Sequence, residues 1–479
     1  MVINIQIGPN VDVSQELGIQ SEPTIAINPK NTQQLFVASK DDEDEPKLST
    51  RYSTDGGITW IPSPYIFDGI GVSAGLPIAC CDPIARADTN GNLFLAYLSD
   101  DRKQIVLVVS SDFGQSFTLV GTSAFSPLIS NDVDQPHLAT ATLSSGDLLV
   151  YMCWVDFGVG GTSGRPAGIY IAGARYTTLP VSLVQITAEA PNSSIGNFGD
   201  ISISRTGKVM ITYQDSSTGN TGPSDIFINT CDGSIPLTTI TWSARSLVAT
   251  SNIGAFWIIP SQASRTIDVE AKLSWDRSNK SFNNRVYLSY TDATTTVGVT
   301  TGPTSMSIKV IHSDDDGVNW SSPKNIRDTT INSSYFPRSA IDQTTGIIGI
   351  SWYDCRNATD IVFENQLYQV FCSFSEDGGN TWLKNIQVGK SLTDANNGSI
   401  DAGDYSDCTF HQGLFYPAWT DSNTLNGANP GPLEDGYEVP EGTLQLDIAT
   451  ARIRVTKRKI IPLPVIIPLP PIITNACGY

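Results

Sequence analysis

The sequence is poor in basic residues and in histidine. Its 479 residues contain 29 Lys and Arg against 48 Asp and Glu, giving a formal net charge of −19. Such a surface repels a nucleic-acid backbone and an anionic membrane, so neither is expected as a partner. Only three histidines are present, and the eight cysteines form no C-x-x-C pair. A zinc site therefore has little support, and buried thiols or a few disulfides are the simpler expectation.

Long apolar runs are also missing, and the first residues do not predict a leader sequence. No run of about 18 apolar residues occurs, so no transmembrane helix is predicted. The first residues, MVINIQIGPNVD, have neither the basic nor the apolar region of a signal peptide. The compartment stays open, with an extracellular or cell-surface location favoured.

Turn-forming residues are abundant. The chain has 40 Gly and 28 Pro, and hydrophobic residues make up 40% of it. Many tight turns combined with enough apolar residues for a large core indicate an all-β protein.

A short motif recurs at YSTDGGITW (52–60), SSDFGQSF (110–117), SDDDGVNW (313–320) and SEDGGNTW (375–382). All four fit Ser-x-Asp-x-Gly-x-Thr/Asn/Ser-Trp/Phe, and each follows an alternating, strand-like run. Glycine allows a positive φ in a hairpin turn, and Ser and Asp can bond the amides of the turn. We refer to these four segments as the boxed turns and expect them to be scaffold.

The boxed turns resemble the Asp-box, or BNR, repeat of the sialidase-like β-propellers. The resemblance covers nearly all of residues 1–455 and implies that the boxed turns lie on the outer rim, away from the ligand face. A second repeat supports it: seven short runs begin near positions 22, 82, 134, 199, 270, 337 and 404. We predict a seven-bladed β-propeller, with six blades, as in true sialidases, as the alternative.

The two chain ends are expected to share one blade. By analogy with KNIQVG at Lys384, residues 3–7 should form the outer strand of the last blade, beside strands near 406–410, 414–419 and 444–453. The propeller domain is assigned to residues 1–455. The remainder, 456–479, is a proline-rich, apolar tail that is expected to be extended.

Acidic residues recur where inner strands start and where the next strands end, and in a propeller both points lie on one face. The predicted ligand-binding set combines these residues with neighbouring aromatic and basic ones: Glu22, Asp82, Asp134, Asp200, Trp154, Asp156, Trp352, Asp354, Arg356, Trp419 and Asp421. Crowded carboxylates either take raised pKa values or require a cation, for which Ca²⁺ is the candidate. Aromatic rings beside carboxylates favour a neutral or cationic glycan. Capping of backbone amides by the aspartates is the structural alternative.

The resemblance also implies a catalytic set, with one departure. The first-blade arginine of the sialidases is replaced by the stretch Ser21, Glu22, Pro23, so authentic sialidase activity is not expected. Tyr405 matches the context of the family's tyrosine nucleophile, with Glu270 as its base, Arg338 as a retained cation and Asp404 as a neighbouring acid. Core packing of Tyr405 and a surface ion pair of Arg338 remain alternatives.

We therefore expect a carbohydrate-binding propeller, with glycoside hydrolysis by paired carboxylates or by Tyr405 and Glu270 as its candidate activity. The alternative is a non-catalytic recognition or attachment propeller that self-associates through the tail.

Overall fold

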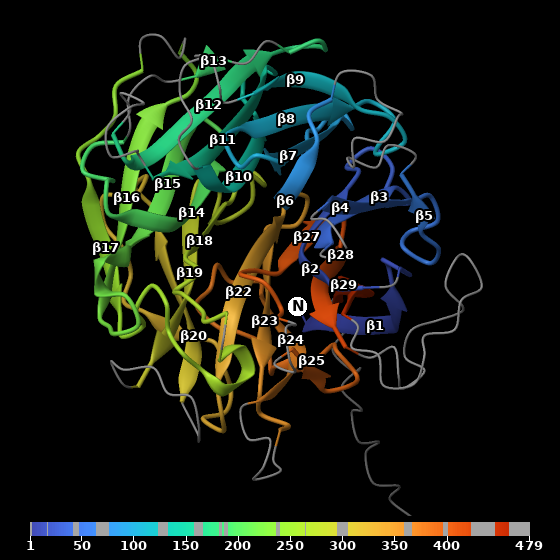
Figure 1. Ribbon diagram of the computed structural model, residues 1–479, viewed down its shortest axis with the longest axis vertical. Coiled ribbons are helices and arrows are strands. Elements are labelled where there is room, and N and C mark those ends of the chain that lie inside the picture. Colours follow the sequence, from blue (N-terminus) through green and yellow to red (C-terminus); the bar gives the residue numbers. More distant parts are fainter. Residues whose placement is uncertain are drawn as a thin grey trace, which may run out of the picture.

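The computed structural model describes residues 2–16, 18–41, 47–63, 76–122, 133–157, 166–181, 184–185, 190–235, 240–263, 265–294, 305–358, 366–395, 401–422 and 446–458. In this part of the chain there are seven antiparallel sheets, each with four strands along its main path. They follow one another around a ring in chain order (Figure 1). The predicted seven-bladed propeller is confirmed, and the six-bladed alternative is wrong.

Each of the first four blades uses four consecutive strands, from the innermost to the outermost. These are β2 (Gln20–Ile27), β3 (Leu35–Asp41), β4 (Lys47–Ser53) and β5 (Ile61–Pro62); β6 (Ala79–Ala87), β7 (Leu93–Ser99), β8 (Ile105–Ser110) and β9 (Thr118–Thr122); β10 (Val133–Thr142), β11 (Leu148–Asp156), β12 (Gly168–Tyr176) and β13 (Val184–Gln185); β14 (Gly196–Ile203), β15 (Lys208–Asp215), β16 (Ser224–Asp232) and β17 (Ser246–Ser251).

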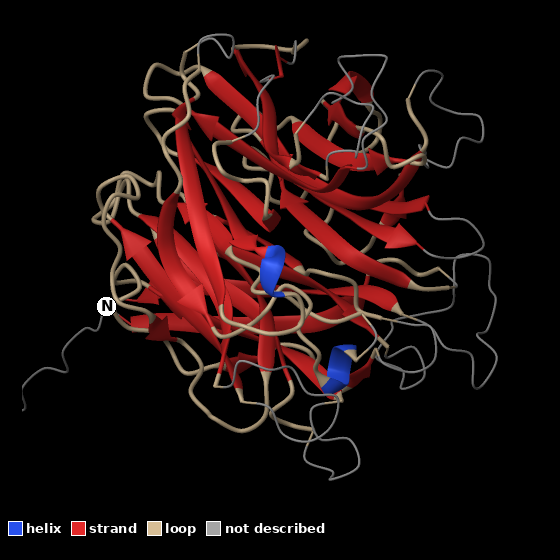
Figure 2. Ribbon diagram, turned by 60° about the vertical axis from the view of Figure 1, so that its left-hand side comes forward, coloured by secondary structure: helices blue, strands red, loops and turns tan. Residues whose placement is uncertain are grey.

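The last three blades complete the ring. Their strands are β18 (Lys272–Trp275), β19 (Val286–Ala293), β20 (Met306–Ser313) and β21 (Lys324–Asn325); β22 (Ser334–Asp342), β23 (Ile347–Asp354), β24 (Leu367–Ser375) and β25 (Ile386–Gln387), with β26 (Thr393–Asp394) also pairing with β24; β27 (Asp407–His411), β28 (Leu414–Asp421), β29 (Asp447–Arg458) and β1 (Val2–Asp12). Helical structure among the described residues is limited to two 3-10 turns, η1 (Ser216–Thr218) and η3 (Pro260–Gln262) (Figure 2). None of the described helices is long and apolar enough to cross a membrane.

The ring closes through the N-terminal strand, as the sequence predicted. β1 pairs antiparallel with β29, with Ile3 opposite Lys457 and Asp12 opposite Ala449 (Figure 1). Side-chain packing closes the ring as well, because Ile25 and Trp60 of blade one share a buried cluster with Tyr416 of blade seven. β29 extends to Arg458, past the predicted boundary at 455, and residues 459–479 of the predicted tail lie outside the described residues.

The boxed turns satisfy their own polar groups. In the first, Asp55 Oδ1 accepts from the amides of Ile58 and Thr59 at 3.0 and 2.9 Å, and Ser53 Oγ accepts from the Gly57 amide at 3.0 Å. Hydrogen bonds from Asn319 and Ser313 lower the pKa of Asp315, the equivalent residue of the third boxed turn, to about 2. These contacts leave the turns with a structural role.

Two faces of the ring can now be distinguished. The face at which the inner strands begin is called the start face. The opposite face carries the turns between the first and second strands of each blade, and it also carries the boxed turns, since the Gly56 amide donates to the Gln33 carbonyl at 2.8 Å. We call it the turn face.

Candidate functional site

The start face carries a repeated backbone distortion. In six blades, a non-glycine residue at the start of the inner strand has a φ between 47° and 55°; these residues are Glu22, Asp82, Gln135, Phe198, Glu270 and Phe336. In most of these blades strand pairing changes register at this point, as expected for a β-bulge. The predicted carboxylates Glu22, Asp82 and Glu270 thus occupy equivalent positions. Asp134 precedes that position by one residue, and Asp200 follows it by two.

A cleft of about 610 Å³ opens on the start face, and we call it the carboxylate cleft. Its lining comes from the first four blades, from the segment between blades four and five, and from the start of blade seven. The residues that matter below are Asp82, Asp134, Gln135, Phe157, Asn197, Phe198, Phe256, Arg265, Asp268 and Asp404. The volume lies in the range of roughly 300–1,000 Å³ that is usual for small-molecule sites.

The segment between blades four and five, residues 252–271, crosses the start face, and we call it the crossing segment. It folds back on itself where Trp257 and Ile267 exchange backbone hydrogen bonds at 2.7 and 2.9 Å. Gln262 then fixes it to blade seven, donating to the Gly403 carbonyl at 2.8 Å and accepting from the Ala402 amide at 3.2 Å. This route brings side chains that belong to no blade repeat into the cleft.

Arg265 of the crossing segment supplies the cation that crowded carboxylates need. Its guanidinium binds both oxygens of Asp404, at 2.8 and 2.7 Å, and Glu22 Oε1 at 2.8 Å. Glu22 is only 1% exposed, and Gly403, with a φ of 74°, packs so closely that a Cβ there would overlap the Glu22 side chain. A bidentate arginine therefore joins two chain-distant carboxylates at the centre of the start face.

Buried carboxyls in the cleft and beside it have raised pKa values. Burial raises the pKa of Glu22 well above its usual value, and nearby Asp82 adds to the shift. Burial and the neighbouring Asp134 do the same for Asp82, while Asp134 itself is raised mainly by burial. The amide of Gln135 donates to both, at 3.2 Å to Asp82 Oδ2 and 3.0 Å to Asp134 Oδ1. Asp82 and Asp134 thus form a carboxyl pair that can share a proton.

One wall of the cleft is aromatic. Phe157 and Phe256 are 47% and 46% exposed, and Phe256 meets the buried Phe198 edge to face at 5.9 Å. Two residues of the lining also carry unsatisfied polar atoms: among the described residues, Gln135 Oε1 and Asn197 Oδ1 are buried without a hydrogen-bond partner. A buried acceptor without a donor costs about 1–3 kcal/mol, so the cleft is prepared for a ligand or for water.

The predicted nucleophile pair does not form. The Tyr405 hydroxyl donates to the Pro83 carbonyl at 3.4 Å, whereas Glu270 makes an ion pair with Lys272 at 2.8 Å. Both residues are buried, and burial, with Asp82 and Glu22 nearby, raises the pKa of Tyr405 well above its usual value. Tyr405 is therefore packed in the core, and Glu270, the predicted base, is paired with Lys272 instead.

Arg338 and Asp200 belong to a layer beneath the cleft, which we call the polar layer. Arg338 is buried rather than on the surface; its Nε donates to the Ser406 carbonyl at 2.6 Å and lies 3.8 Å from Asp407. Asp200 lies 3.6 Å from His137, whose other ring nitrogen is 3.4 Å from Lys272 Nζ. Arg86 completes the layer through Asp407 at 2.7 Å. These contacts link residues of the inner strands of blades two to seven.

The prediction that the aromatic residues at the strand ends bind a ligand needs correction. Trp154, Trp352 and Trp419 are 1%, 0% and 2% exposed and pack in hydrophobic clusters within and between blades, so they offer no ring face to a ligand. Their neighbours Asp156, Asp354 and Asp421 are buried as well. Side chains two residues apart in a strand share one side of the sheet, and here that side faces an adjoining blade.

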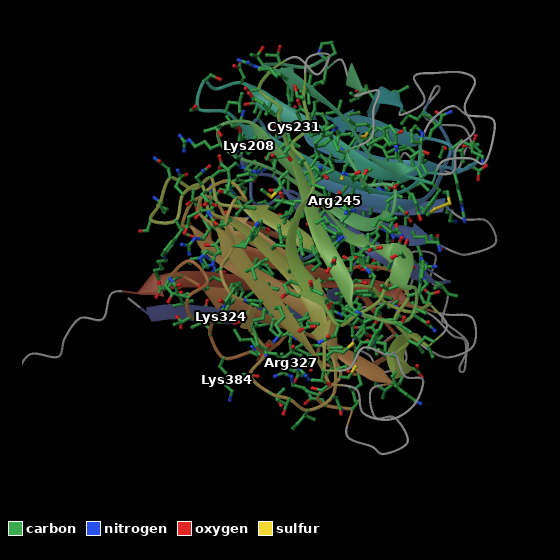
Figure 3. The ribbon with its side chains drawn as sticks, turned by 90° about the vertical axis from the view of Figure 1, so that its left-hand side faces the viewer. Lys208, Cys231, Arg245, Lys324, Arg327 and Lys384 are labelled. Atoms are coloured by element: carbon green, nitrogen blue, oxygen red, sulfur yellow. A yellow bond between two sulfur atoms is a disulfide. The ribbon has the colours of Figure 1, made fainter. Side chains whose placement is uncertain are left out.

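Arg356 has a structural place too. It bonds Asp354 Oδ2 at 2.7 Å and Asp328 Oδ1 at 2.7 Å, and its guanidinium covers the Phe371 ring at 4.2 Å. Burial would raise the pKa of Asp354, but Arg356 and Arg327 hold it below its usual value. Arg327, labelled in Figure 3, belongs to this buried ion network rather than to the carboxylate cleft.

No group of three or more His, Cys, Asp or Glu side chains in the described ranges is arranged to hold a metal ion. The candidate Ca²⁺ therefore finds no site of this kind among these residues. Adjacent Cys80 and Cys81 form a disulfide at the start of β6, and Cys81 lines the carboxylate cleft beside Asp82.

Comparison with known proteins gives structural neighbours only. No protein-family model matches the sequence, and no curated protein matches it. The chain is similar to the α-L-arabinofuranosidase Arb93A from Fusarium graminearum in complex with an iminosugar inhibitor, with a TM-score of 0.47 and 11% identity, over 94% of this chain and 98% of that one. It is similar to the Hadza microbial sialidase Hz136, with a TM-score of 0.43 and 14% identity, over 80% and 73% of the two chains. It is also similar to the phage phi92 endosialidase, with a TM-score of 0.45 and 9% identity, over 98% and 71%. At such identities a likeness concerns the fold, which the strand pairing of this chain gives directly.

Proposed function

We propose that the carboxylate cleft binds a carbohydrate without a carboxylate group and hydrolyses a glycosidic bond in it. The supporting observation is that one cleft of about 610 Å³ combines half-exposed aromatic rings with buried carboxyls of raised pKa. Sugar rings stack on aromatic faces, and their hydroxyls donate to acceptors such as the unsatisfied oxygens of Gln135 and Asn197.

Each carboxyl takes a distinct role in the proposed reaction. Asp82, whose pKa is raised by burial and by the neighbouring Asp134, gives its proton to the leaving oxygen as the glycosidic bond breaks. Asp404, held by the two hydrogen bonds from Arg265, accepts a proton from the attacking water, whose oxygen bonds to the anomeric carbon. Tyr405 is not needed in this scheme.

The charge of the site argues against sialic acid as the substrate. Glu22 stands where the resembled sialidases have an arginine, and Arg265 is already engaged by Glu22 and Asp404. A substrate carboxylate would meet carboxyl groups without a free arginine fork to bind it. Neutral and cationic glycans are the substrates that fit.

A glycan array and a panel of chromogenic glycosides test the proposal. Asp82→Asn should reduce turnover by roughly 100-fold or more while binding persists. Asp225→Asn is the matched control, because Asp225 lies on β16 and its side chain accepts a hydrogen bond from Thr250 at 2.7 Å, its one such bond among the described residues. For binding, Phe256→Ala should weaken the glycan by about tenfold.

Leu247→Ala is the control for Phe256→Ala, since Leu247 is 56% exposed on the outer strand β17. Failure to bind any glycan, or equal loss in both alanine variants, would contradict a carbohydrate site in the cleft. Binding without turnover by the unmodified protein would reject hydrolysis and leave a recognition propeller, the alternative function.

A further inference from the structure

A second cavity, of about 560 Å³, lies on the ring axis at the turn face, and we call it the axial cavity. It is lined by the inner strands and by the turns that follow them, including Pro29, Thr89, Thr142, Thr344 and His411. Arg86, Asp200, Lys272 and Arg338 of the polar layer lie at its inner end, which separates it from the carboxylate cleft. The two sites are therefore distinct.

The lining of the axial cavity is basic in a strongly acidic protein. Five cationic side chains line it: Arg86, Arg205, Lys272, Arg277 and Arg338. Two carboxylates line it, Asp88 and Asp200, although the whole chain carries a net charge of −19. Positive charge gathered in a recess of low dielectric attracts anions more strongly than the same charges spread over a surface.

The carboxylates of this lining are already engaged by neutral donors. Asp88 accepts hydrogen bonds from Asn90, Asn92 and Tyr176 at 2.7 to 2.9 Å. Asp200 accepts from the Leu273 amide at 2.7 Å and lies beside His137. Neither carboxylate forms an ion pair with an arginine of the cavity among the described contacts. Two carboxylates behind the lining do pair with its cations: Asp407 lies 2.7 Å from Arg86 and 3.8 Å from Arg338, and Glu270 lies 2.8 Å from Lys272. Among the described contacts, Arg205 and Arg277 are therefore the lining cations without an ion pair.

Several arginine donors remain available. Arg338 is 3% exposed, and its Nη2 is buried without a hydrogen-bond partner in the described structure. Arg277 donates from Nη1 to the Ile203 carbonyl at 2.7 Å, and loss of hydration lowers its pKa to about 10. Arg205 has no hydrogen bond or ion pair with any described residue. An unsatisfied, buried guanidinium donor is costly, so the arrangement calls for an acceptor.

We propose that the axial cavity binds a dianionic tetrahedral oxyanion, phosphate or sulfate, carried by a small organic molecule. Arginine forks match the paired oxygens of such groups and bind them with charge-assisted hydrogen bonds. The volume of about 560 Å³ leaves room for an organic part beside the oxyanion. This site is independent of the glycan function proposed for the start face.

Isothermal titration calorimetry with inorganic sulfate, inorganic phosphate and glucose 6-phosphate, in a chloride background of matched ionic strength, tests the proposal. Saturable binding is expected for all three probes, with glucose 6-phosphate the tightest. Arg205→Gln should weaken binding by about tenfold, since it removes one charge-assisted contact. Because Arg205 has no other described partner, this variant should unfold at the same temperature as the unmodified protein without anion.

Lys208→Gln is the matched control. Lys208 lies in the same hairpin as Arg205 but makes an ion pair with Asp316 at 2.9 Å, and Figure 3 labels it at the edge of blade four. Its loss should leave anion binding unchanged. A response that only follows ionic strength, or equal affinity in the Arg205 and Lys208 variants, would overturn the proposal. Equal affinity for phosphate and glucose 6-phosphate would overturn the organic carrier and leave a site for the free ion.

Discussion

Substitution of Arg265 is the most informative perturbation, because this side chain neutralises two carboxylates, Glu22 and Asp404, that the fold brings together. Glu22 is 1% exposed and Arg265 is 31% exposed, and they are joined at 2.8 Å. Removing one partner of a fully buried ion pair costs roughly 3–5 kcal/mol, and the partial exposure of Arg265 moves the expected value to the lower end, about 3 kcal/mol. Its contact with the more exposed Asp404 adds about 1 kcal/mol or less.

The cost of Arg265→Gln should depend on pH. Burial raises the pKa of Glu22, and removal of the guanidinium raises that pKa further, because Arg265 favours the ionised form. Near pH 5 Glu22 can hold a proton and needs no cation, so only the Asp404 contact is lost. As the pH rises, the unfolded chain releases the Glu22 proton, whereas the folded variant must either retain that proton or bury an unpaired charge, so near pH 9 the loss should approach the sum of both contacts, about 3 to 4 kcal/mol.

Urea unfolding followed by tryptophan fluorescence at both pH values measures this difference. Arg265→Gln combined with Glu22→Gln should restore most of the stability near pH 9, since no buried charge remains. Arg175→Gln is the control, because Arg175 pairs with Asp147 on the surface. A loss that is the same at both pH values, or that Glu22→Gln does not rescue, would refute the reasoning.

Three further outcomes follow from the structure. Deletion of residues 2–12 removes the strand paired with β29, so thermal unfolding in scanning calorimetry should begin earlier and lose cooperativity; an unchanged transition would exclude the closure role. Reduction of the Cys80–Cys81 disulfide should change the unfolding free energy by less than about 1 kcal/mol, because no residue lies between the bonded cysteines. Glycan affinity should change, since Cys81 lines the carboxylate cleft. A large drop in the urea midpoint would argue against this. Burial raises the pKa of Asp12 from 3.8 to about 7, so the folded state holds a proton that the unfolded state has released. Stability should therefore fall by about 3 kcal/mol between about pH 5 and 8, and Asp12→Asn should remove that share; an unchanged pH profile in this variant would contradict it.

The sequence was informative wherever the chain repeats. The recurring inner-strand starts and the boxed turns predicted seven blades, and the likeness of residues 3–7 to an outer strand predicted the closure with β29. Glu22 and Asp82 were also correctly placed on the start face. Such features are local in sequence or repeated, so a single chain reveals them.

Features that depend on contacts between blades were not predictable. The crossing segment belongs to no repeat, and Arg265, Asp268 and Phe256 therefore gave no signal in the sequence. The strand-end tryptophans were misassigned, because alternation fixes which side of a sheet a residue occupies but not whether another blade covers that side. Asp200 was wrongly assigned to the start face. The bulge in β14 adds one residue and shifts the alignment of this strand with β15, and the sequence does not reveal that shift.

The most direct test of the account is a crystal structure of the protein with the glycan that binds most tightly on the array. We expect a sugar ring against Phe256, with hydroxyl groups within about 3.2 Å of Gln135 Oε1 or Asn197 Oδ1 and the glycosidic oxygen next to Asp82. A glycan bound at the boxed turns, on the outer strands or in the axial cavity, with the carboxylate cleft occupied only by solvent, would contradict it.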